Sequence, residues 1–547
     1  MSRTAEPLTV LVPAGGSLSG RGLGPAPPLH SHPLWLPAGS GLAIEQISRF
    51  HAANPAVAEI LVVVNPGAAP APQLRALRGV RLLEIPEQPH IGGSIAAALA
   101  AVRTNWVQVN PITTLPSRAA AAALQVQIGD TNLLQDDWSA LQPLAGGGWR
   151  FLSKQRPSGQ YPTSRPFTGV LTAPTTLLAS LLKALPAGAG ADLLNLAEPL
   201  VQHHGAAVVT GPWYDLGHRA SVAASRRSRL PSRAFNRLHH CPQRDAIVKH
   251  SSDGRRLAAE RTYLEQLPPP LRRHFPALLP PRPGEEQALV MEAIPFPSLA
   301  ELFLHWRIGA NAWIAILERL AAILADFAAA RPPQPGPASW LYSGKLQQRW
   351  ARLQQLPLPL EPGWCSTELQ INGRWYPSLE RTLEQMLIAL EPLEANSRLQ
   401  LIHGDLCFNN ILCDPLYTTV RLIDPRGEAP PAGLGPIGSG DSRYDLIKLN
   451  HSIAGLYDAT VNNLFALQHQ GQRLELQLYA PPDHRLLQEA FEQLLLAAVP
   501  AAERRTLTAS LFLSMLPLHA EDPARLLALA ATGVLLWHGD LERAVLR

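Results

Sequence analysis

The chain has 547 residues, of which 46% are hydrophobic, and this length accommodates two or three domains with sizeable cores. A net charge of only +4, with no dense basic stretch apart from a short Arg- and Ser-rich run at 225–233, argues against nucleic acid as a partner. The longest late apolar runs are too short to cross a bilayer, and the first residues lack a charged region followed by a long apolar one. We therefore expect a cytoplasmic protein without a membrane span.

Two residue types are informative because they are scarce. The four cysteines form no CxxC pair and have no histidine at metal spacing, which indicates reduced thiols. Basic charge is carried mainly by arginine, so a lysine at a motif position carries more information than usual. The five lysines are Lys154, Lys183, Lys249, Lys345 and Lys448.

The chain begins with a short apolar strand, Leu8 to Val12, followed directly by the glycine-rich stretch PAGGSLSGRGL at 13–23. Backbone N–H groups of such a turn can approach a phosphate because no side chains stand in the way. Strand-like and helix-like segments then alternate, which predicts a mainly parallel sheet covered by helices. The expected elements are a helix at 41–54, strands at 59–64 and 80–85, a helix at 93–103 and a strand at 106–109.

These N-terminal features resemble the sugar-phosphate nucleotidyltransferases, a family with a Rossmann-like α/β sheet. The similar segments are HPLWLPAGSGLAIEQ at 32–46, HIGGSIAAAL at 90–99, FTGVLTA at 167–173 and WYDLGH at 213–218. The resemblance implies a nucleotide or sugar-phosphate site that includes Gly15, Gly16 and Arg21 of the glycine-rich turn. It also implies that Asp215 is one metal ligand.

Two departures from that family affect its chemistry. The family has a Pro-Lys pair after the glycine-rich turn, whereas this chain has His32, Pro33 and Leu34 and no lysine before Lys154. The family has Gly-Asp after its mid-domain strand, whereas this chain reads VQVNPITTLP at 107–116, so Mg²⁺ would lose its main anchor. Asp130 could substitute, but it lies one strand later. We expect residues 1–222 to keep the fold with weak or no nucleotidyl transfer.

An Arg- and Ser-rich linker is predicted at 223–236, and a second domain at 237–547. DAIVKHSS at 245–252 is an expected strand that carries Lys249, and RRLAAERTYLEQL at 255–267 is an expected helix that carries Glu260. In kinase-like folds a strand lysine paired with a helix acid holds the α and β phosphates of ATP, and these two residues fit those roles.

The rest of the second domain is expected to be mainly helical. A strand at 287–294 would lead into a hinge where adenine binds the backbone, and Glu292 marks it, although a lone acid there could equally be solvated. Apolar spacing predicts helices at 299–306, 311–330 and 378–393, and helical structure from 484 onward.

The most specific pattern of the chain lies between Leu401 and Glu428, LIHGDLCFNNILCDPLYTTVRLIDPRGE. Two apolar runs each lead to an acid, Asp405 and Asp424, and Asn410 follows the first acid by five positions. This is phosphoryl-transfer spacing: the first acid can accept a proton from an attacking hydroxyl, the amide can reach a metal, and the second acid can hold Mg²⁺ against ATP phosphates.

The tetrapeptide HGDL recurs at 538–541, without an amide and a second acid at the same spacing. We interpret that copy as a helix end without catalytic meaning.

The pattern at 401–428 resembles the catalytic and metal-binding loops of the aminoglycoside phosphotransferase and choline kinase family, which has a bilobal fold related to protein kinases. The resemblance implies that Asp405 is the base, that Asn410 and Asp424 bind the metal, and that His403 is a structural partner of the loop. Gly404 stands where protein kinases usually have the arginine that reads a phosphorylated activation loop, which argues against such a switch.

Asp445, in DSRYDLIKL at 441–449, matches a family position that braces the catalytic loop. A simple acid at a helix N-terminus is an equally good interpretation of this residue.

The sequence therefore predicts an α/β N-terminal domain and an α+β, bilobal kinase-like C-terminal domain. We expect an ATP- and Mg²⁺-dependent phosphotransferase acting on a hydroxyl of a small sugar or polyol, because the fusion resembles proteins of bacterial capsule and surface-polysaccharide biosynthesis. One alternative is a bifunctional sugar kinase and nucleotidyltransferase that makes an NDP-sugar. Another is an inactive regulatory nucleotide-binding protein. A third is an aminoglycoside acceptor, which would require an acidic pocket.

Overall fold

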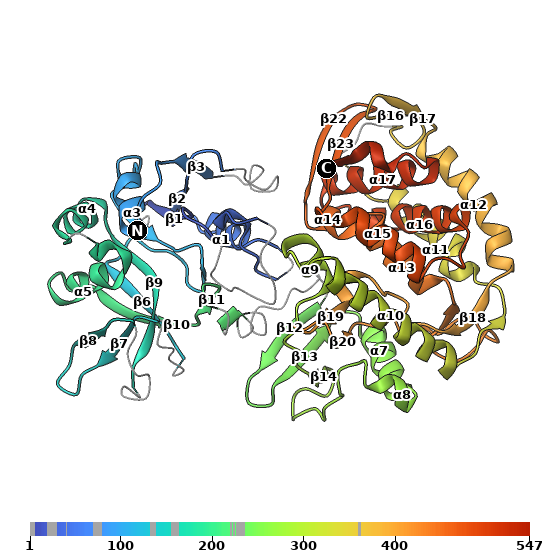
Figure 1. Ribbon diagram of the computed structural model, residues 1–547, viewed down its shortest axis with the longest axis horizontal. Coiled ribbons are helices and arrows are strands. Elements are labelled where there is room, and N and C mark those ends of the chain that lie inside the picture. The colour runs from blue at the N-terminus through green and yellow to red at the C-terminus, as the bar shows by residue number, and fades with distance from the viewer. Residues whose placement is uncertain are drawn as a thin grey trace. The chain divides into compact units, whose positions relative to one another are not determined.

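The structure is a computed structural model (Figure 1). It describes residues 6–546 except 19–29, 40, 69–78, 132–137, 155–162, 187, 219–220, 223–224, 226–235 and 359–362. The chain divides into two compact units, residues 1–228 and 229–547. Arg21 and most of the predicted linker lie outside the described residues.

A nine-stranded mixed sheet forms the frame of the described part of the first unit, with the main path β10-β6-β9-β4-β1-β2-β3. Neighbouring strands are parallel except at β9, which runs antiparallel to both neighbours on this path. Its strands are β1 (Leu8–Pro13), β2 (Val57–Val64), β3 (Val80–Glu84), β4 (Trp106–Val109), β6 (Gln125–Gly129), β7 (Ala140–Pro143), β8 (Trp149–Leu152), β9 (Arg165–Pro174) and β10 (Ala207–Gly211). A short pair, β5 (Thr114–Leu115) and β11 (Tyr214–Asp215), lies off this sheet.

Helices pack on this sheet through small and branched apolar side chains. All six residues of β1 are buried, as expected for a strand covered on both faces. The core cluster joins Leu11 and Leu61 of the sheet to Ile95, Leu178 and Leu200 of three helices. The helices are α1 (Ala43–Ala52), α3 (Ile91–Leu99), α4 (Thr175–Ala184) and α5 (Leu194–Gln202), with the 3₁₀ helices η1 (Pro33–Trp35) and η3 (Ala189–Ala191). The predicted, mainly parallel α/β sheet is confirmed.

The second unit starts with a small antiparallel sheet of β12 (Asn236–Cys241), β13 (Ala246–Ser251) and β14 (Leu289–Glu292). In sequence, the helices α7 (Gly254–Gln266) and α8 (Pro269–Arg272) lie between β13 and β14. Asp253 starts α7 because its side chain accepts a hydrogen bond from the Arg256 N–H at 3.1 Å. The strand and helix expected at 245–252 and 255–267 are confirmed, whereas β12 was not expected.

The remainder of the second unit is mainly helical, as expected for an α+β domain. Its helices are α9 (Leu299–His305), α10 (Ala310–Ala330), α11 (Ser343–Gln354), α12 (Leu379–Ala395), α13 (Tyr444–Ile453), α14 (Tyr457–Val461), α15 (His484–Leu494), α16 (Ala501–Met515) and α17 (Pro523–His538), with 3₁₀ helices η4 (Ser339–Leu341), η5 (Phe408–Asn410), η6 (Leu516–Leu518) and η7 (Leu541–Ala544). The second HGDL copy is a helix end, as predicted, because His538 closes α17 and Gly539 caps it in the left-handed conformation.

Three small groups of strands accompany these helices. β15 (Gln334–Pro335), β18 (Arg398–Leu401) and β21 (Ser439–Asp441) form one sheet, and β19 (Ile411–Cys413) pairs with β20 (Val420–Leu422). The third group was not expected: β16 (Leu369–Ile371), β17 (Arg374–Tyr376), β22 (Phe465–Gln470), β23 (Arg473–Tyr479) and β24 (Val545–Leu546). Among the described residues, no helix combines the length and apolar character needed to cross a membrane.

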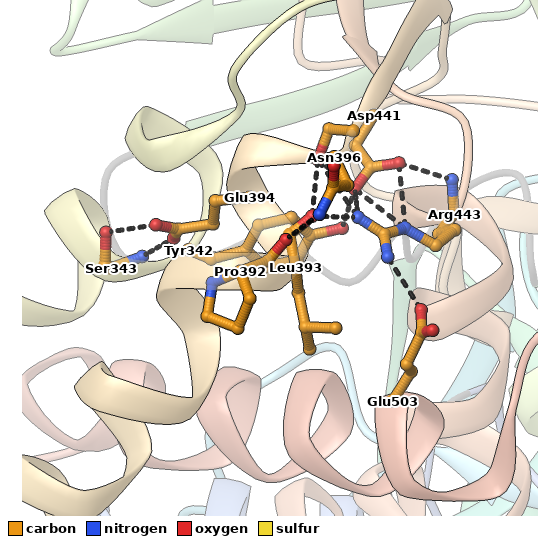
Figure 2. Close-up of polar contacts among 10 residues, drawn as sticks. Tyr342, Ser343, Pro392, Leu393, Glu394, Asn396, Asp441, Arg443 and Glu503 are labelled. Atoms are coloured by element: carbon orange, nitrogen blue, oxygen red, sulfur yellow. Dashed lines mark hydrogen bonds and ion pairs between the residues drawn. The ribbon is translucent and has the colours of Figure 1, made fainter.

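A buried polar network joins β21 to α12 and α16 (Figure 2). The guanidinium of Arg443 donates to Asp441 at 2.8 Å, to Glu503 at 2.7 Å and to the Leu393 carbonyl at 2.6 Å. Asp441 is fully buried, and such a carboxylate needs compensating donors. The network fixes the strand that leads into α13.

A second contact in Figure 2 fixes the start of α11. The carboxylate of Glu394 accepts hydrogen bonds from the backbone N–H of Ser343 at 2.6 Å and from its hydroxyl at 2.7 Å. A carboxylate at a helix N-terminus satisfies an N–H group that has no partner within the helix and favours the helix dipole. The end of α12 thereby sets the position of α11.

Candidate active site

The loop after β18 carries Asp405, and Asp445 holds that loop in place. The carboxylate of Asp445 accepts hydrogen bonds from the backbone N–H groups of His403 at 2.7 Å and Gly404 at 2.9 Å. Burial raises the pKa of Asp445 to about 6. The bracing contact expected for Asp445 is confirmed, and the residue also lies in the first turn of α13.

His403 links this loop to the one that carries Asp424. Its Nδ1 accepts a hydrogen bond from the Asp405 N–H at 3.2 Å, and its Nε2 lies 3.1 Å from the Ile423 carbonyl, to which it can donate. Burial lowers the pKa of His403 to about 4, so the imidazole is neutral at pH 7 and its two nitrogens can play these two roles. The expected structural role of His403 is confirmed.

A two-stranded hairpin brings Asn410 and Asp424 together. β19 and β20 pair directly, and at their end the Ile423 N–H donates to the Asn410 carbonyl at 3.0 Å. The Asn410 side chain donates through Nδ2 to the Asp405 carbonyl at 2.8 Å, so its amide oxygen is the atom that can act as a ligand.

An amide oxygen and a carboxylate suit Mg²⁺, which commonly takes one or two protein carboxylates and completes its shell with phosphate oxygens and water. Within the described residues there is no cluster of three or more His, Cys, Asp or Glu suited to a metal. The amide oxygen of Asn410 and the carboxylate of Asp424 are of the kind that Mg²⁺ takes from a protein.

Lys249 of β13 joins the small sheet to the Asp424 loop. Its ammonium lies 2.6 Å from a carboxylate oxygen of Glu260 on α7 and 2.5 Å from one of Asp424. Burial lowers the pKa of Lys249, but the neighbouring charges of Asp424 and Glu260 outweigh burial and raise it. The expected contact between Lys249 and Glu260 is present, and the side chain stays charged.

Two cations beside Asp405 were not singled out from the sequence. Lys448 of α13 lies 2.8 Å from one carboxylate oxygen of Asp405, and Arg426 lies 3.5 Å from the other. Burial would lower the pKa of Lys448, but the charge of Asp405 raises it overall. The scarcity of lysine was the signal that could have identified Lys448, because it lies in the same motif as Asp445.

Gly404 is required by backbone conformation and by space. Its φ is +79°, in the left-handed region, and a Cβ there would lie 2.9 Å from the Cβ of Arg426. The glycine that replaces the protein-kinase arginine thus makes room for Arg426, whose backbone N–H donates to the His403 carbonyl at 3.0 Å.

Glu292, the acid expected to mark the hinge, contacts the β19–β20 hairpin. Its carboxylate accepts hydrogen bonds from Arg421 of β20 at 2.7 Å and from the Ala277 N–H at 3.1 Å.

The candidate site residues that the structure describes in the N-terminal unit are Gly15, Gly16 and Asp215. Gly15 and Gly16 follow β1 as expected, with Gly16 at φ +87°. The buried carboxylate of Asp215 accepts a hydrogen bond from the Gly217 N–H at 2.8 Å and contacts His218 at 2.8 Å and the Ser221 hydroxyl.

Asn110, fully buried, follows β4, the mid-domain strand after which the nucleotidyltransferase family has its acid. Its amide nitrogen donates to the Pro111 and Thr114 carbonyls, and its oxygen contacts His51. Asp130 is exposed at the end of β6 and belongs to no metal-type cluster of the described residues.

A comparison with protein families found a match within the second unit. Residues 237–425 match the phosphotransferase enzyme family. The match contains the candidates from Lys249 to Asp424, and it confirms the resemblance expected for this part of the chain. No curated protein matches.

Solved structures of nucleotidyltransferases are similar to the N-terminal part of the chain. One is a Bacillus anthracis protein assigned as a glucose-1-phosphate thymidylyltransferase, in complex with a sucrose (10% identity, 41% of this chain and 98% of that chain, TM-score 0.31). Another is a UTP-bound UGPase from Acinetobacter baumannii (15% identity, 40% of this chain and 92% of that chain, TM-score 0.30). A third is 2-C-methyl-D-erythritol 4-phosphate cytidylyltransferase from Thermus thermophilus (18% identity, 40% of this chain and 97% of that chain, TM-score 0.26).

A substitution at Gly404 tests whether the position of Arg426 requires that residue 404 has no side chain. We expect Gly404→Ala to destabilise the phosphotransferase unit by about 2–5 kcal/mol, since it adds overpacking against Arg426 to the cost of a left-handed alanine. Gly373→Ala is the matched control, because Gly373 has the same φ of +79° and open space around it, so only about 1–2 kcal/mol is expected there. Thermal unfolding of both variants measures the difference. Equal destabilisation would contradict the steric role.

Proposed function

We propose that the second unit transfers the γ-phosphoryl group of ATP to a hydroxyl of a small molecule. The observation that carries the proposal is the arrangement around Asp424. Lys249 of the small sheet, which Glu260 of α7 holds, contacts Asp424, and the β19–β20 hairpin brings Asn410 close to Asp424. Asn410 in turn bonds the backbone of Asp405. Such an arrangement serves positioning and charge stabilisation, which dominate catalysis of phosphoryl transfer.

Each residue has a definite part in this scheme. Lys249, held by Glu260, orients the ATP phosphates, and Asn410 with Asp424 holds the magnesium ion. When bound, that ion supplies positive charge to the phosphate oxygens as charge develops on them. Asp405 accepts a hydrogen bond, and then the proton, from the acceptor hydroxyl. Lys448 keeps the Asp405 carboxylate ionised and fixes its direction.

The intact set of groups favours an enzyme over an inactive regulatory protein. A buried Lys249 and a buried Asp405 are costly to keep charged, and both are retained with specific partners. A protein that only binds a nucleotide would not need a buried carboxylate such as Asp405.

For the acceptor we propose a sugar or polyol that feeds bacterial surface-polysaccharide synthesis, with the reaction in the cytoplasm. The support for this is the fusion of a phosphotransferase domain to a nucleotidyltransferase-like fold, together with four cysteines that form no disulfide.

Replacing the proposed base tests the mechanism. We expect Asp405→Asn to lower kcat by about 10²- to 10⁴-fold while ATP still binds, because the amide cannot accept the hydroxyl proton. The second HGDL copy offers a matched control: Asp540→Asn changes the same tetrapeptide and should leave kcat unchanged. Kinetics and melting temperatures are measured for both variants. Normal turnover by Asp405→Asn would remove this residue from the mechanism.

For the N-terminal unit we propose a fold without efficient nucleotidyl transfer. This is supported by Asn110, whose amide is fully engaged where a metal-binding acid would be needed, and by the contacts that occupy the carboxylate of Asp215. A bifunctional kinase and nucleotidyltransferase is the alternative.

A pyrophosphate-release assay distinguishes the two possibilities. With each nucleoside triphosphate, Mg²⁺ and a panel of sugar phosphates, we expect no release above that of an Asp215→Asn control. Robust release that depends on one sugar phosphate and is lost in the control would establish the bifunctional enzyme.

A further inference from the structure

Three cations of the second unit, of which Arg426 lies next to Asp405, have no part in the phosphotransfer scheme. Lys345 and Arg349 lie one turn apart on α11, so their side chains leave the same face of the helix. Arg426 lies two residues after Asp424 and reaches Asp405 from the other side of the loop. We refer to Lys345, Arg349 and Arg426 as the basic cluster.

The basic cluster has little opposing charge. Lys345 donates to the hydroxyl of Tyr444 at 2.7 Å, and Arg349 donates to the backbone carbonyl and hydroxyl of Ser514 at 3.0 and 3.3 Å. Over the part of the chain that the structure describes, neither forms an ion pair with a carboxylate. Both residues donate their hydrogen bonds to uncharged groups, while Asp405 and Glu428 act on Arg349 as nearby charges without forming an ion pair with it.

Arg426 is also incompletely matched. It lies 3.5 Å from Asp405, which Lys448 already pairs more closely, and 3.4 Å from the exposed carboxylate of Glu428. Its buried Nε has no hydrogen-bond partner among the described residues. A buried donor without a partner is costly, so Arg426 retains capacity to bind an anion.

The three charges also disfavour one another. Burial lowers the pKa of Lys345, and the positive charges of Arg426 and Arg349 lower it further. Burial likewise lowers the pKa of Arg349, and Arg426 adds to the effect, whereas the charges of Asp405 and Glu428 oppose it. A bound anion would relieve this repulsion, whereas a core without a ligand gains nothing from it.

The fold nevertheless holds the cluster rigidly. Glu394 fixes the first turn of α11 two residues before Lys345 (Figure 2), and Ser514 at the end of α16 fixes Arg349. Lys345 is one of only five lysines in the chain, and the other two in this unit, Lys249 and Lys448, contact Asp424 and Asp405. Rigidly held cations that have few carboxylate partners are typical of an anion-binding site.

We propose that the acceptor is an anion: a small polyhydroxy molecule with a phosphate or carboxylate group that binds the basic cluster while its hydroxyl meets Asp405. This inference rests on the proposed phosphotransferase function and names its substrate class. Lys345 and Arg349 would fix the anionic group, and Arg426 would contact both that group and the catalytic loop. A polycationic aminoglycoside is disfavoured because the same charges repel it.

The test compares acceptors that differ only in charge, using the full chain and MgATP. A hexose, the corresponding hexose monophosphate, the hexuronate and the amino hexose are assayed for ATP-dependent phosphorylation. We expect kcat/KM to be highest for the phosphate or the carboxylate, and the comparison of these two identifies the anionic group.

Variants of the basic cluster test whether these residues cause the preference for an anionic acceptor. We expect Lys345→Met and Arg349→Met each to lower kcat/KM for the anionic acceptor by about 10- to 100-fold, mainly through KM, with KM for ATP unchanged. Exposed cations provide the controls: Arg352→Met lies on the same helix, and Lys183→Met lies in the N-terminal unit. Melting temperatures verify folding, and Arg349→Lys, which keeps the charge, should retain most activity if Arg349→Met proves unstable.

Several outcomes would overturn the inference while phosphotransfer itself stands. These are preference for the neutral or amino hexose, unchanged acceptor kinetics in the variants, or a rise in KM for ATP instead, which would assign the cluster to the nucleotide.

If no acceptor is phosphorylated, calorimetric titration with the hexose monophosphate tests whether the anion site exists. Binding that the wild type shows and Lys345→Met loses supports the anion site, and equal binding or none in both proteins overturns it. The phosphotransferase proposal fails by a separate result, the absence of MgATP binding.

Discussion

The candidate site depends on keeping charged side chains buried next to one loop, and each of them needs a specific partner because water cannot reach it. Asp445 is satisfied by two backbone N–H groups, and this choice fixes the path of the loop. Asp405 is satisfied by Lys448, which fixes the direction of the carboxylate. Glu260 is satisfied by Lys249, which in turn reaches Asp424. The geometry of the site follows from these pairings.

The same constraint explains why Gly404 and His403 stand where they do. A neutral imidazole can accept from one backbone group and donate to another, so His403 joins two loops without adding a charge to a crowded site. Gly404 leaves room for Arg426, which brings a cation next to Asp405. The loop is thus held in one conformation by the fold itself.

Local patterns allowed much of this to be predicted from the sequence. Asp405 and Asp424 could be predicted because each follows an apolar run, Asn410 because it follows Asp405 by five positions, and Lys249 because lysine is scarce. Lys448 and Arg426 were not identified, since their pairing with Asp405 depends on how α13 and the Asp424 loop pack. The β22–β23 hairpin was missed although β23 alternates buried and exposed residues, a pattern that does indicate a strand. Asn110 is the converse case: the segment 107–116 lacks the acid that the nucleotidyltransferase family has there, and the Asn110 amide instead donates hydrogen bonds to two backbone carbonyls.

The most direct test of the account is calorimetric titration of the full chain with ATP, with and without Mg²⁺. Lys249→Met is compared with Lys183→Met, which removes an exposed lysine elsewhere. We expect binding that requires Mg²⁺ and weakens by about 10- to 100-fold in Lys249→Met only, because a charge-assisted contact to phosphate is lost. Equal affinity in the two variants, or no binding by the wild type, would contradict the nucleotide site on which the proposed phosphotransfer rests.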